Sequence, residues 1–414
     1  MKKRFGLLGE KLGHSFSPLI HKYLGDYDYS LFEVAPGDLG AFMAGRRFDG
    51  INVTIPYKQA VLPYCDSVSG EARDIGSVNT IIKDTDGSLH GYNTDIFGFC
   101  FMLERAGIDP GGKKSIILGS GGSARTVRYA LDRLDAREIV TISRRGDDNY
   151  DNISRHFDAD IIVNTTPVGM YPGNGASPVR LDSFARLAGV ADLIYNPLRT
   201  KLLLDAESLG IPCVNGLAML VAQAEMASRL FLDVPARPEL IDAIRAEITG
   251  KMRNVILIGM PGSGKSTVGA ALAGQMGRQF IDIDEKIASA AGKSIPAIFS
   301  EDGEDAFRRL ETRVTADESK KSGAVIATGG GVVTRPENLD LLRQNGIIIY
   351  LERDTGELPS DGRPLSQAVG VRALAERRIP LYKAWSDYTV ETVADVDATA
   401  DRIMDIISRN EARR

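Results

Sequence analysis

The stretch GMPGSGKST, which begins at Gly259, has the residue types and the spacing of a phosphate-binding loop. It fits the pattern GxxxxGK[ST], follows the β-branched run NVILI and precedes STVGAALAGQM, which can form a helix. Its glycines let successive backbone N–H groups face phosphate oxygens, and the helix N-terminus adds its dipole. We predict that Lys265 reaches the β- and γ-phosphates of a nucleotide and that Ser266 binds Mg²⁺. The alternative is a glycine-rich turn with a surface lysine.

A second glycine-rich turn, GSGGSA, follows the run KSIILG and precedes the helical pattern TVRYALDRL. It matches GxGxx[GA] through Gly119, Gly121 and Ala124, which predicts a pyrophosphate site. The next strand ends in Ser143-Arg144-Arg145, where an NAD enzyme would carry an acidic residue. Two arginines suit a 2′-phosphate, so the sequence favours NADP over NAD. Asp147 and Asp148 could instead neutralise the arginines, which keeps NAD open.

Short β-rich runs alternate with helical patterns along the whole chain, which predicts an α/β protein with parallel sheets and helices on their faces. The length of 414 residues favours two to three domains. The segment PARPELIDAIRAEITGK at 235–251 is charged and helix-prone, and NVILIG then restarts the pattern. We therefore place a first domain at 1–245, a linker at 246–251 and a second domain at 252–414.

Composition excludes several classes of protein. With 43% hydrophobic and 25% charged residues the chain is expected to be globular, and its apolar runs are too short to span a membrane. A net charge of −5 argues against a nucleic-acid surface. The three cysteines form no CxxC pair, the four histidines have no metal-ligand spacing, and no secretory signal is evident. These features predict a cytoplasmic protein without a membrane or nucleic-acid partner, and they leave its oligomeric state open.

Several motifs behind the phosphate loop resemble shikimate kinase over 252–414. They are FIDIDEKI with Asp282 and Asp284 on the same side of a strand end, GEDAFRRLE with Arg308 on a helix, ATGGGVV with Gly329, Gly330 and Gly331, GRPLS with Arg363, and ERRIPLY with Arg378. The motifs HRD and DFG of protein kinases and NKxD of GTPases are missing. Taken singly, paired aspartates are often helix caps and helical arginines are often solvated.

The resemblance implies a role for each of these residues. Asp282 and Ser266 would belong to the Mg²⁺ shell, and Asp284 would contact the substrate hydroxyls as the candidate base. Arg308, Arg378 and the backbone of 329–331 would hold the shikimate carboxylate, since a small anion needs bidentate guanidinium partners. The residues implied for ATP are Gly262, Ser263, Gly264, Lys265, Ser266, Thr267 and, in a short lid, Arg363.

The first 245 residues contain a second set of motifs, which resembles shikimate dehydrogenase. The set comprises HSFSP at 14–18, INVTIPYK at 51–58, VNT at 78–80, YNTD at 92–95, NTTPVGM at 164–170, YNP at 195–197 and NGLAMLVAQAE at 215–225. The substrate residues that the resemblance implies are Ser15, Ser17, Thr54, Asn79, Asp95, Tyr195 and Gln223. Those implied for NADP are Gly119, Gly121, Gly122, Ser123, Ala124, Ser143, Arg144, Arg145, Thr165, Gly216 and Met219.

The same resemblance implies that Lys58 and Asp95 form the catalytic pair. A lysine ammonium beside a ketone can polarise the oxygen and donate its proton as hydride reaches the carbon, while a carboxylate orients the ammonium. Helix capping is the structural alternative: Ser17 before Pro18 suits a helix start, and Asp95 could cap the helix after YNT. The combination of NVTIPYK, YNTD and GLAMLVAQ is not explained by capping.

Together the two resemblances predict a fusion enzyme of aromatic amino-acid precursor synthesis. Its first part, with a substrate subdomain at 1–100 plus 216–245 and a Rossmann-type subdomain at 101–215, would reduce 3-dehydroshikimate to shikimate with NADPH. Its second part, a P-loop domain with a parallel sheet, would phosphorylate shikimate to shikimate 3-phosphate with MgATP. The alternatives are an NAD-linked quinate/shikimate dehydrogenase fused to a small-molecule kinase, and a non-catalytic ligand-binding module.

Overall fold

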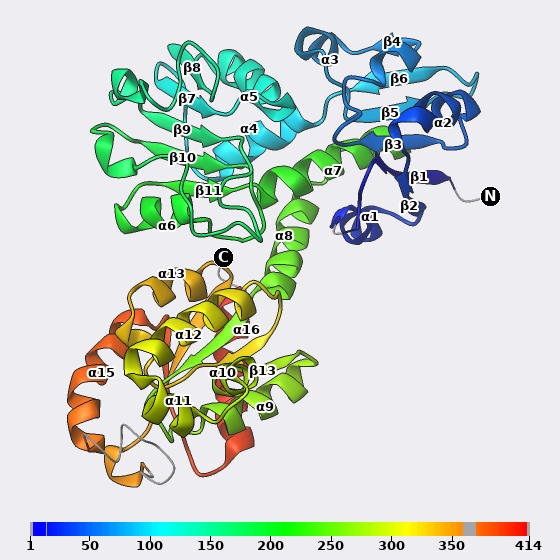
Figure 1. The fold of residues 1–414 in the computed structure, drawn as a ribbon. Coiled ribbons are helices and arrows are strands. Elements are labelled where there is room, and N and C mark those ends of the chain that lie inside the picture. The colour runs from blue at the N-terminus through cyan, green and yellow to red at the C-terminus, as the bar shows by residue number, and fades with distance from the viewer. Residues whose placement is uncertain (1–2, 14, 359–369, 412–414) are drawn as a thin grey trace. The chain divides into compact units, whose positions relative to one another are not determined.

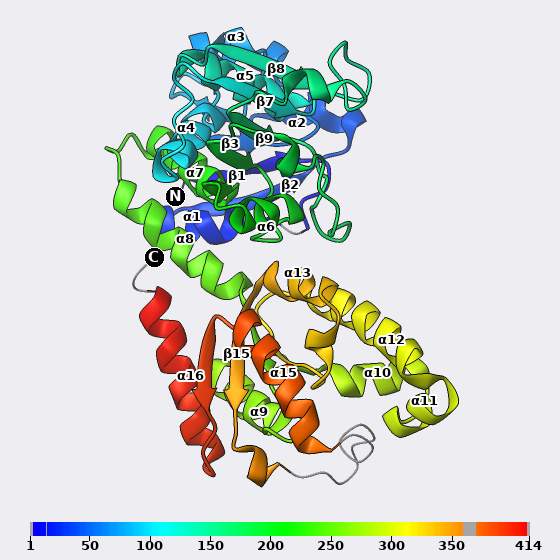
Figure 2. The ribbon, with the colours of Figure 1, turned by 90° about the vertical axis from the view of Figure 1, so that its left-hand side faces the viewer.

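The structure, a computed structural model, describes residues 3–13, 15–358 and 370–411 (Figures 1 and 2). The chain divides into two compact units. The first comprises Met1–Met170, Ala176–Tyr195 and Asp205–Arg245, and the second comprises Tyr171–Gly175, Asn196–Leu204 and Ala246–Arg414. Both units layer helices on β-sheets, which confirms the predicted α/β class.

The N-terminal half of the first unit is built on a six-stranded sheet in the order β2-β1-β3-β5-β6-β4. Its elements are β1 (Arg4–Gly9), α1 (Ser17–Leu24), β2 (Asp28–Glu33), α2 (Leu39–Gly45), β3 (Gly50–Val53), β4 (Ser67–Val68), α3 (Gly70–Ile75), β5 (Thr80–Lys83) and β6 (Leu89–Tyr92). Strand β5 runs antiparallel to both β3 and β6, so this sheet is mixed, whereas the alternation of β-rich runs and helical patterns favoured parallel sheets. The β5–β6 pair is antiparallel because the connection between the two strands is short, with Gly87 at φ of +88°; parallel neighbours would need a long crossover.

The other half of the first unit is a five-stranded parallel sheet in the order β11-β10-β9-β7-β8, which confirms the predicted Rossmann-type arrangement. Its elements are α4 (Asp95–Arg105), β7 (Lys114–Leu118), α5 (Gly122–Arg133), β8 (Glu138–Ile142), β9 (Ile161–Asn164), β10 (Gly189–Asp192), β11 (Cys213–Asn215) and α7 (Leu217–Leu232). Helix α6 (Lys201–Ser208) crosses the unit boundary, since its residues up to Leu204 belong to the second unit. Buried apolar residues of β7 and β9 pack with α4 and α5 in one core that includes Phe99, Ile117, Val127 and Val163.

Helices α4 and α7 pack closely against each other, and a glycine makes this possible. A Cβ atom on Gly98 of α4 would lie 2.6 Å from the carbonyl oxygen of Met219 in α7, which is closer than a side chain tolerates. The close approach brings the N-terminal turn of α4, which carries Asp95, beside the α7 turn that carries Gln223.

The second unit is a five-stranded parallel sheet in the order β13-β14-β12-β15-β16. Its elements are β12 (Asn254–Ile258), α9 (Lys265–Met276), β13 (Phe280–Asp282), α10 (Ile283–Ala291), α11 (Ile295–Glu301), α12 (Gly303–Glu318), β14 (Val325–Ala327), α13 (Glu337–Arg343), β15 (Gly346–Glu352), α15 (Val371–Trp385), β16 (Tyr388–Glu391) and α16 (Val396–Glu411). The first strand of this unit, β12, leads directly into the phosphate loop, which explains why that loop lies so late in the chain.

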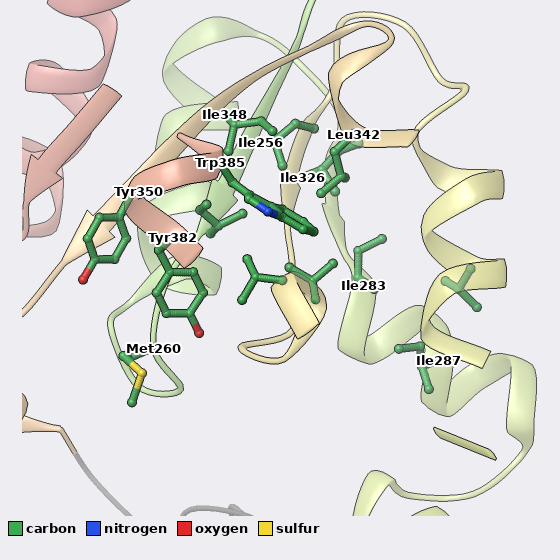
Figure 3. Packing of buried hydrophobic residues seen from close by; sticks show 14 of the residues in the cluster. Ile256, Met260, Ile283, Ile287, Ile326, Leu342, Ile348, Tyr350, Tyr382 and Trp385 are labelled. Carbon is green, nitrogen blue, oxygen red and sulfur yellow. The ribbon is translucent and has the colours of Figure 1, made fainter. Parts of the chain in front are cut away.

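Alternate residues of these strands form two cores, one on each face of the sheet. One core joins the strands to α9 and α16. In the other core, Trp385 of α15 lies near Ile256, Ile326 and Ile348, which are paired in register on β12, β14 and β15 (Figure 3). Both faces of the sheet are therefore covered, as a parallel sheet requires.

Helix α8 (Pro238–Met252) runs through the segment assigned to a linker, so residues 246–251 are helical. The Pro238 start agrees with the preference for proline in the first turn of a helix. Among the described residues, no helix combines the length and the apolar character needed to cross a membrane.

Two candidate active sites

A cavity of about 460 Å³ in the first unit gathers residues from many of the predicted motifs. Of the predicted site residues, those that line it are Ser15, Ser17, Thr54, Lys58, Asn79, Asp95, Ser123, Tyr195, Gly216, Met219 and Gln223. They come from distant parts of the sequence, and both halves of the unit contribute. One wall holds the predicted substrate residues, and Ser123, Gly216 and Met219 extend the cavity toward the predicted cofactor turn.

Lys58 and Asp95 form an ion pair in the wall of this cavity. The Lys58 Nζ atom lies 2.7 Å from Asp95 Oδ2, and the side chains are 23% and 13% exposed. Lys58 is fixed through its backbone, because the Val78 N–H donates to its carbonyl oxygen. Asp95 is the first residue of α4, and its N–H donates to Asn93 Oδ1 at 3.1 Å. An ammonium is thus presented to the cavity with its charge balanced by a carboxylate.

Asn79 is held in a buried hydrogen-bond network. Its Oδ1 accepts from the Thr94 N–H at 2.7 Å, and its Nδ2 donates to Thr94 Oγ1 at 3.0 Å. The Thr94 hydroxyl also lies 3.4 Å from Gln223 Oε1. Thr94 therefore links two predicted substrate residues; it was missed in the sequence although it lies inside YNTD.

Asn52, which lines the cavity, was also missed. It lies two positions before Thr54, and residues two apart on an extended chain face the same side, so the spacing could have identified it. Asn52 Oδ1 accepts from the Tyr29 hydroxyl at 2.8 Å, and its Nδ2 donates to Thr80 Oγ1 at 3.1 Å.

Ser15 and Ser17 meet at the start of α1. The Ser17 N–H donates to Ser15 Oγ at 3.2 Å, and Ser17 is buried. Phe16, not Ser17, is the residue that precedes the helix, so Ser17 is not the N-cap that the capping alternative required. Tyr195, across the cavity, packs edge-on against Phe16, and burial raises the pKa of its phenol.

The turn between β7 and α5 has the geometry of a pyrophosphate site. Gly119 has φ of +102°, and a Cβ atom there would lie 2.9 Å from Thr165 Oγ1, so only glycine fits this position. Gly121 and Gly122 face open space at the N-terminus of α5. Ala124 lies in the first turn of α5 and is buried. The helix dipole and free backbone N–H groups therefore point into an open volume that suits an anion.

Ser143, Arg144 and Arg145 directly follow β8, and both arginine side chains are exposed. In a parallel sheet this carboxyl end of β8 lies at the same edge as the glycine turn after β7, because the two strands pair in register. The predicted 2′-phosphate residues and the predicted pyrophosphate turn are thus on neighbouring strands.

The phosphate loop of the second unit has the backbone geometry that its sequence predicts. Gly259, Gly262 and Gly264 adopt φ of +152°, +87° and +90°, which other residues rarely do. Lys265 begins α9, is buried, and donates to the carbonyl oxygens of Gly259 and Met260 at 3.0 and 2.9 Å. Its ammonium therefore lies inside the loop. Ser263 is buried in the loop, while the Ser266 and Thr267 side chains are exposed at the start of α9.

Ser266 and Asp282 meet where β13 ends. The Ser266 hydroxyl donates to Asp282 Oδ2 at 2.5 Å, and Asp282 Oδ1 accepts from the Asp284 N–H at 2.9 Å. Asp282 thus caps α10, and Asp284 lies in the first turn of that helix, so the expectation that both lie at a strand end is wrong for Asp284. A hydroxyl and a carboxylate are hard oxygen ligands of the kind that Mg²⁺ takes beside phosphate and water.

Metal binding at this point would use few protein groups. Across the described part of the chain, no cluster of three or more histidine, cysteine or acidic residues is arranged to hold a metal ion. A site of one hydroxyl and one carboxylate fits Mg²⁺, which keeps several waters and shares substrate phosphates, better than a metal that needs a full protein cage.

The backbone of the three glycines 329–331 packs against two buried arginines. A Cβ atom on Gly331 would overlap the guanidinium of Arg308, which occupies the space that a side chain would need. Arg378 Nη1 donates to the Gly330 carbonyl oxygen at 3.2 Å, and the Tyr382 hydroxyl donates to the same oxygen. Both predicted carboxylate ligands therefore converge on one turn of backbone.

Carboxylates surround these arginines. Arg308 Nη1 lies 2.7 Å from Glu311 Oε2, and its Nη2 lies 3.2 Å from Glu304 Oε1. The other oxygen of Glu311, Oε1, is buried without a hydrogen-bond partner among the described residues. It points toward Gly329, as Asp284 Oδ1 does, because a Cβ there would be 2.7 and 2.6 Å from the two oxygens.

Burial dominates the electrostatics of this cluster. It raises the pKa of Asp284 against the opposing effect of Lys265, and it raises the pKa of Glu311 against that of Arg308. Burial also lowers the pKa of Arg378, and the nearby Arg308 adds to that direction. Two like-charged guanidinium groups held together in a dry site favour an anion between them.

Glu311 and Tyr382 were missed in the sequence. Glu311 is three residues after Arg308 on a helix, a spacing that brings side chains together, and Tyr382 is one turn after Arg378. Arg363, the predicted lid residue, lies outside the described residues.

Comparisons with known proteins agree with both sets of motifs. The family model of the shikimate dehydrogenase substrate-binding domain matches residues 7–81, and that of shikimate kinase matches residues 261–408. The NADP(+) shikimate dehydrogenase of Moorella thermoacetica is 38% identical over 276 residues, which is 59% of this chain and 92% of that protein.

Two solved structures resemble the first unit. A chorismate mutase/shikimate 5-dehydrogenase fusion protein from Clostridium acetobutylicum is 37% identical, with a TM-score of 0.57, covering 60% of this chain and 97% of that one. Shikimate 5-dehydrogenase from Thermus thermophilus, solved with NADP(H) and shikimate, is 31% identical, with a TM-score of 0.54, covering 59% and 99%. The chain therefore belongs to the shikimate dehydrogenase family and carries, behind that part, a shikimate kinase domain.

Proposed function

We propose that this chain catalyses two consecutive reactions, the NADPH-dependent reduction of 3-dehydroshikimate to shikimate and the ATP-dependent phosphorylation of shikimate to shikimate 3-phosphate. The observation that supports the first reaction most strongly is the Lys58–Asp95 ion pair in a cavity that polar groups line on several sides. A purely structural ion pair would not need an open cavity beside it. Residues 1–245 would catalyse the first reaction and residues 252–414 the second, with the boundary between the two parts in α8.

In the first reaction the residues of the cavity would hold the substrate and move one proton. Ser15 and Ser17 would bind its carboxylate, while Thr54, Asn79 and Gln223 would bind its hydroxyls. NADPH, bound at the β7–α5 turn, would supply the hydride. Lys58 would donate its Nζ proton to the ketone oxygen, and Asp95 would keep the ammonium oriented and stabilise its charge before the transfer.

In the second reaction the buried cluster would orient shikimate and remove one proton. Arg308 and Arg378 would bind the carboxylate. Asp284 would accept the proton of the attacking hydroxyl, and its raised pKa makes it a stronger base than an exposed aspartate. Lys265 would leave its loop carbonyl partners and contact the phosphates.

Magnesium fits the Ser266–Asp282 pair. These two side chains would hold the ion, which when bound neutralises charge on the phosphates of ATP. The hydrogen bond from the Ser266 hydroxyl to Asp282 Oδ2 already holds these two side chains together where they would hold the ion.

The proposal is tested by measuring the reductase and kinase activities of the whole chain with different cofactors and substrates. NADPH should be oxidised by 3-dehydroshikimate with a kcat/KM at least about tenfold above that with NADH, since one charged hydrogen bond to the 2′-phosphate is worth about 1.5–3 kcal/mol. A preference for NADH, with quinate oxidised as well as shikimate, would instead favour the NAD-linked alternative. Failure to form shikimate 3-phosphate from shikimate and MgATP would remove the second half of the proposal.

A further inference from the structure

The loop that follows β8, residues 143–152 and hereafter the β8 loop, is closed by its own hydrogen bonds. The Ser143 N–H donates to the Asp148 carbonyl oxygen at 3.2 Å. Asn152 Nδ2 donates to the Asp147 carbonyl oxygen at 2.8 Å, and the Asn149 N–H donates to Asn152 Oδ1 at 2.8 Å. These hydrogen bonds give the loop a defined backbone conformation. The backbone therefore fixes the direction in which the side chains at 144, 145, 147 and 148 leave the chain.

The two arginines of the β8 loop have no acidic partner within the part of the chain that the structure describes. Arg144 and Arg145 are exposed, and neither forms an ion pair there. Burial raises the pKa of Tyr150, and the charge of Arg144 opposes this shift. Two adjacent aspartates would be expected to neutralise such arginines. Another contact must therefore hold an aspartate side chain away from the guanidinium groups.

His156 binds one of these aspartates. Its Nε2 lies 2.8 Å from Asp148 Oδ1, and the side chains are 12% and 38% exposed. A carboxylate only accepts hydrogen bonds, so Nε2 is the donor. The other ring nitrogen, Nδ1, is buried with no hydrogen-bond partner among the described residues, so the contact with Asp148 is the one polar bond that the ring is known to make.

The position of Asp148 determines how its carboxylate would affect cofactor binding if the hydrogen bond with His156 were lost. The end of the second strand of a Rossmann sheet is where NAD enzymes place the carboxylate that binds the ribose hydroxyls and repels a 2′-phosphate. A free Asp148 carboxylate, three or four residues from Arg144 and Arg145 in a closed loop, would either pair with a guanidinium or place negative charge beside the phosphate. Both effects weaken NADPH binding and leave NADH binding nearly unchanged.

We propose that His156 is a positioning residue for cofactor discrimination, which acts by holding Asp148 so that Arg144 and Arg145 stay available to the 2′-phosphate. This inference rests on the proposed function, because it requires the two arginines to bind that phosphate. It adds a residue outside both glycine motifs and assigns a role to Asp148, one of the two acidic residues that kept NAD open in the sequence.

The experiment measures KM for NADPH and NADH in the whole chain, with kcat, KM for 3-dehydroshikimate and the kinase rate as internal controls. His156→Ala should raise KM for NADPH about two- to fivefold, the range expected for a partly exposed charge contact. KM for NADH and the control parameters should stay within measurement error. His156→Gln should retain most of the NADPH affinity, since its amide nitrogen can donate in place of Nε2.

The double variant His156→Ala/Asp148→Ala separates this role from simple loosening of the loop. Removing the released carboxylate should return KM for NADPH to near the wild-type value. If the double variant binds NADPH as poorly as His156→Ala, or if His156→Ala leaves the NADPH/NADH preference unchanged, the inference is overturned.

The variant Arg144→Ala distinguishes failure of the inference about His156 from failure of the proposed NADPH-dependent function. It should lower the preference for NADPH about tenfold or more. If Arg144→Ala changes the preference and His156→Ala does not, only the inference about His156 fails. If Arg144→Ala leaves the preference unchanged, the arginines do not bind the 2′-phosphate, and the cofactor assignment fails together with the inference.

Discussion

The two candidate sites balance their charges in different ways. In the first unit one lysine meets one aspartate at the edge of an open cavity, with side chains 23% and 13% exposed. In the second unit Arg308 and Glu311 are 5% and 0% exposed, and a second arginine and a second carboxylate lie beside them. The first site is a single compensated pair, and the second is a buried cluster in which like charges crowd together.

This difference predicts different sensitivities. Loss of one partner from an accessible pair lets water solvate the other, so the effect should be confined to chemistry. In the buried cluster, desolvation already raises the pKa of Asp284 and Glu311, so changes there should alter stability and pH dependence as well as activity.

The largest expected effect is that of Lys58→Ala on the reductase. Removing the proton donor should lower kcat/KM by about 10²–10⁴-fold, the usual contribution of general acid catalysis, and leave the kinase rate unchanged. Initial rates with each substrate measure both. Lys11→Ala is a matched control, because Lys11 lines the same cavity; an equal loss in both variants would mean that cavity charge, rather than the Lys58–Asp95 pair, carries the chemistry.

Asp284→Asn should lower the kinase rate by about 10²-fold or more, because an amide cannot accept the proton. The same change should raise the midpoint of thermal unfolding of the second unit at neutral pH. A carboxyl with a raised folded-state pKa is less favourably ionised in the folded protein than in the unfolded chain, so the stability that its neutral form gives is lost as pH rises through that pKa. Calorimetry with and without the substitution tests the sign, and a lower midpoint would contradict it.

The raised pKa of Asp284 also predicts the acid limb of the kinase pH profile. The carboxylate must be ionised to act as a base, so activity should fall as pH decreases through a value above the ordinary 3.8 of an aspartate. Plots of kcat/KM for shikimate against pH measure it. An acid limb at or below the ordinary value would show that a different group accepts the proton.

Arg378→Ala should affect shikimate binding more than turnover. Losing one charged hydrogen-bond partner of a carboxylate costs about 1.5–3 kcal/mol, which corresponds to an increase in KM for shikimate of about 10- to 100-fold. Arg377→Ala is the matched control, since Arg377 is the exposed neighbour on the same helix. Equal behaviour of the two variants would place the carboxylate elsewhere.

The smallest effect concerns the scaffold of the first unit. Gly98→Ala introduces a methyl group 2.6 Å from the Met219 carbonyl oxygen, so α4 and α7 must separate. We expect a loss of about 1–3 kcal/mol in the free energy of unfolding, a weaker reductase and an unaltered kinase. An unchanged unfolding midpoint would mean that the two helices are free to shift apart.

The sequence was most informative where a ligand-binding turn requires a particular backbone conformation. GMPGSGKST and GSGGSA predicted strand, turn and helix together, because positive φ angles and helix N-termini leave few residue choices. It was least informative where partners are far apart in the chain. Nothing local indicates that Thr94 bridges Asn79 to Gln223, since this contact depends on tertiary packing. The antiparallel pairing of β5 and β6 was not predicted, although the short DTDG turn between them indicates a hairpin.

The most direct test of two linked activities is the product formed when 3-dehydroshikimate, NADPH and MgATP are incubated together with the whole chain. Mass spectrometry should find shikimate 3-phosphate with the wild-type protein, shikimate alone with Asp284→Asn, and unreacted 3-dehydroshikimate with Lys58→Ala. Adding the two variants together should restore the final product. Phosphorylated 3-dehydroshikimate, or shikimate 3-phosphate formed by Lys58→Ala alone at the wild-type rate, would contradict the order of the two steps and the roles assigned to these residues.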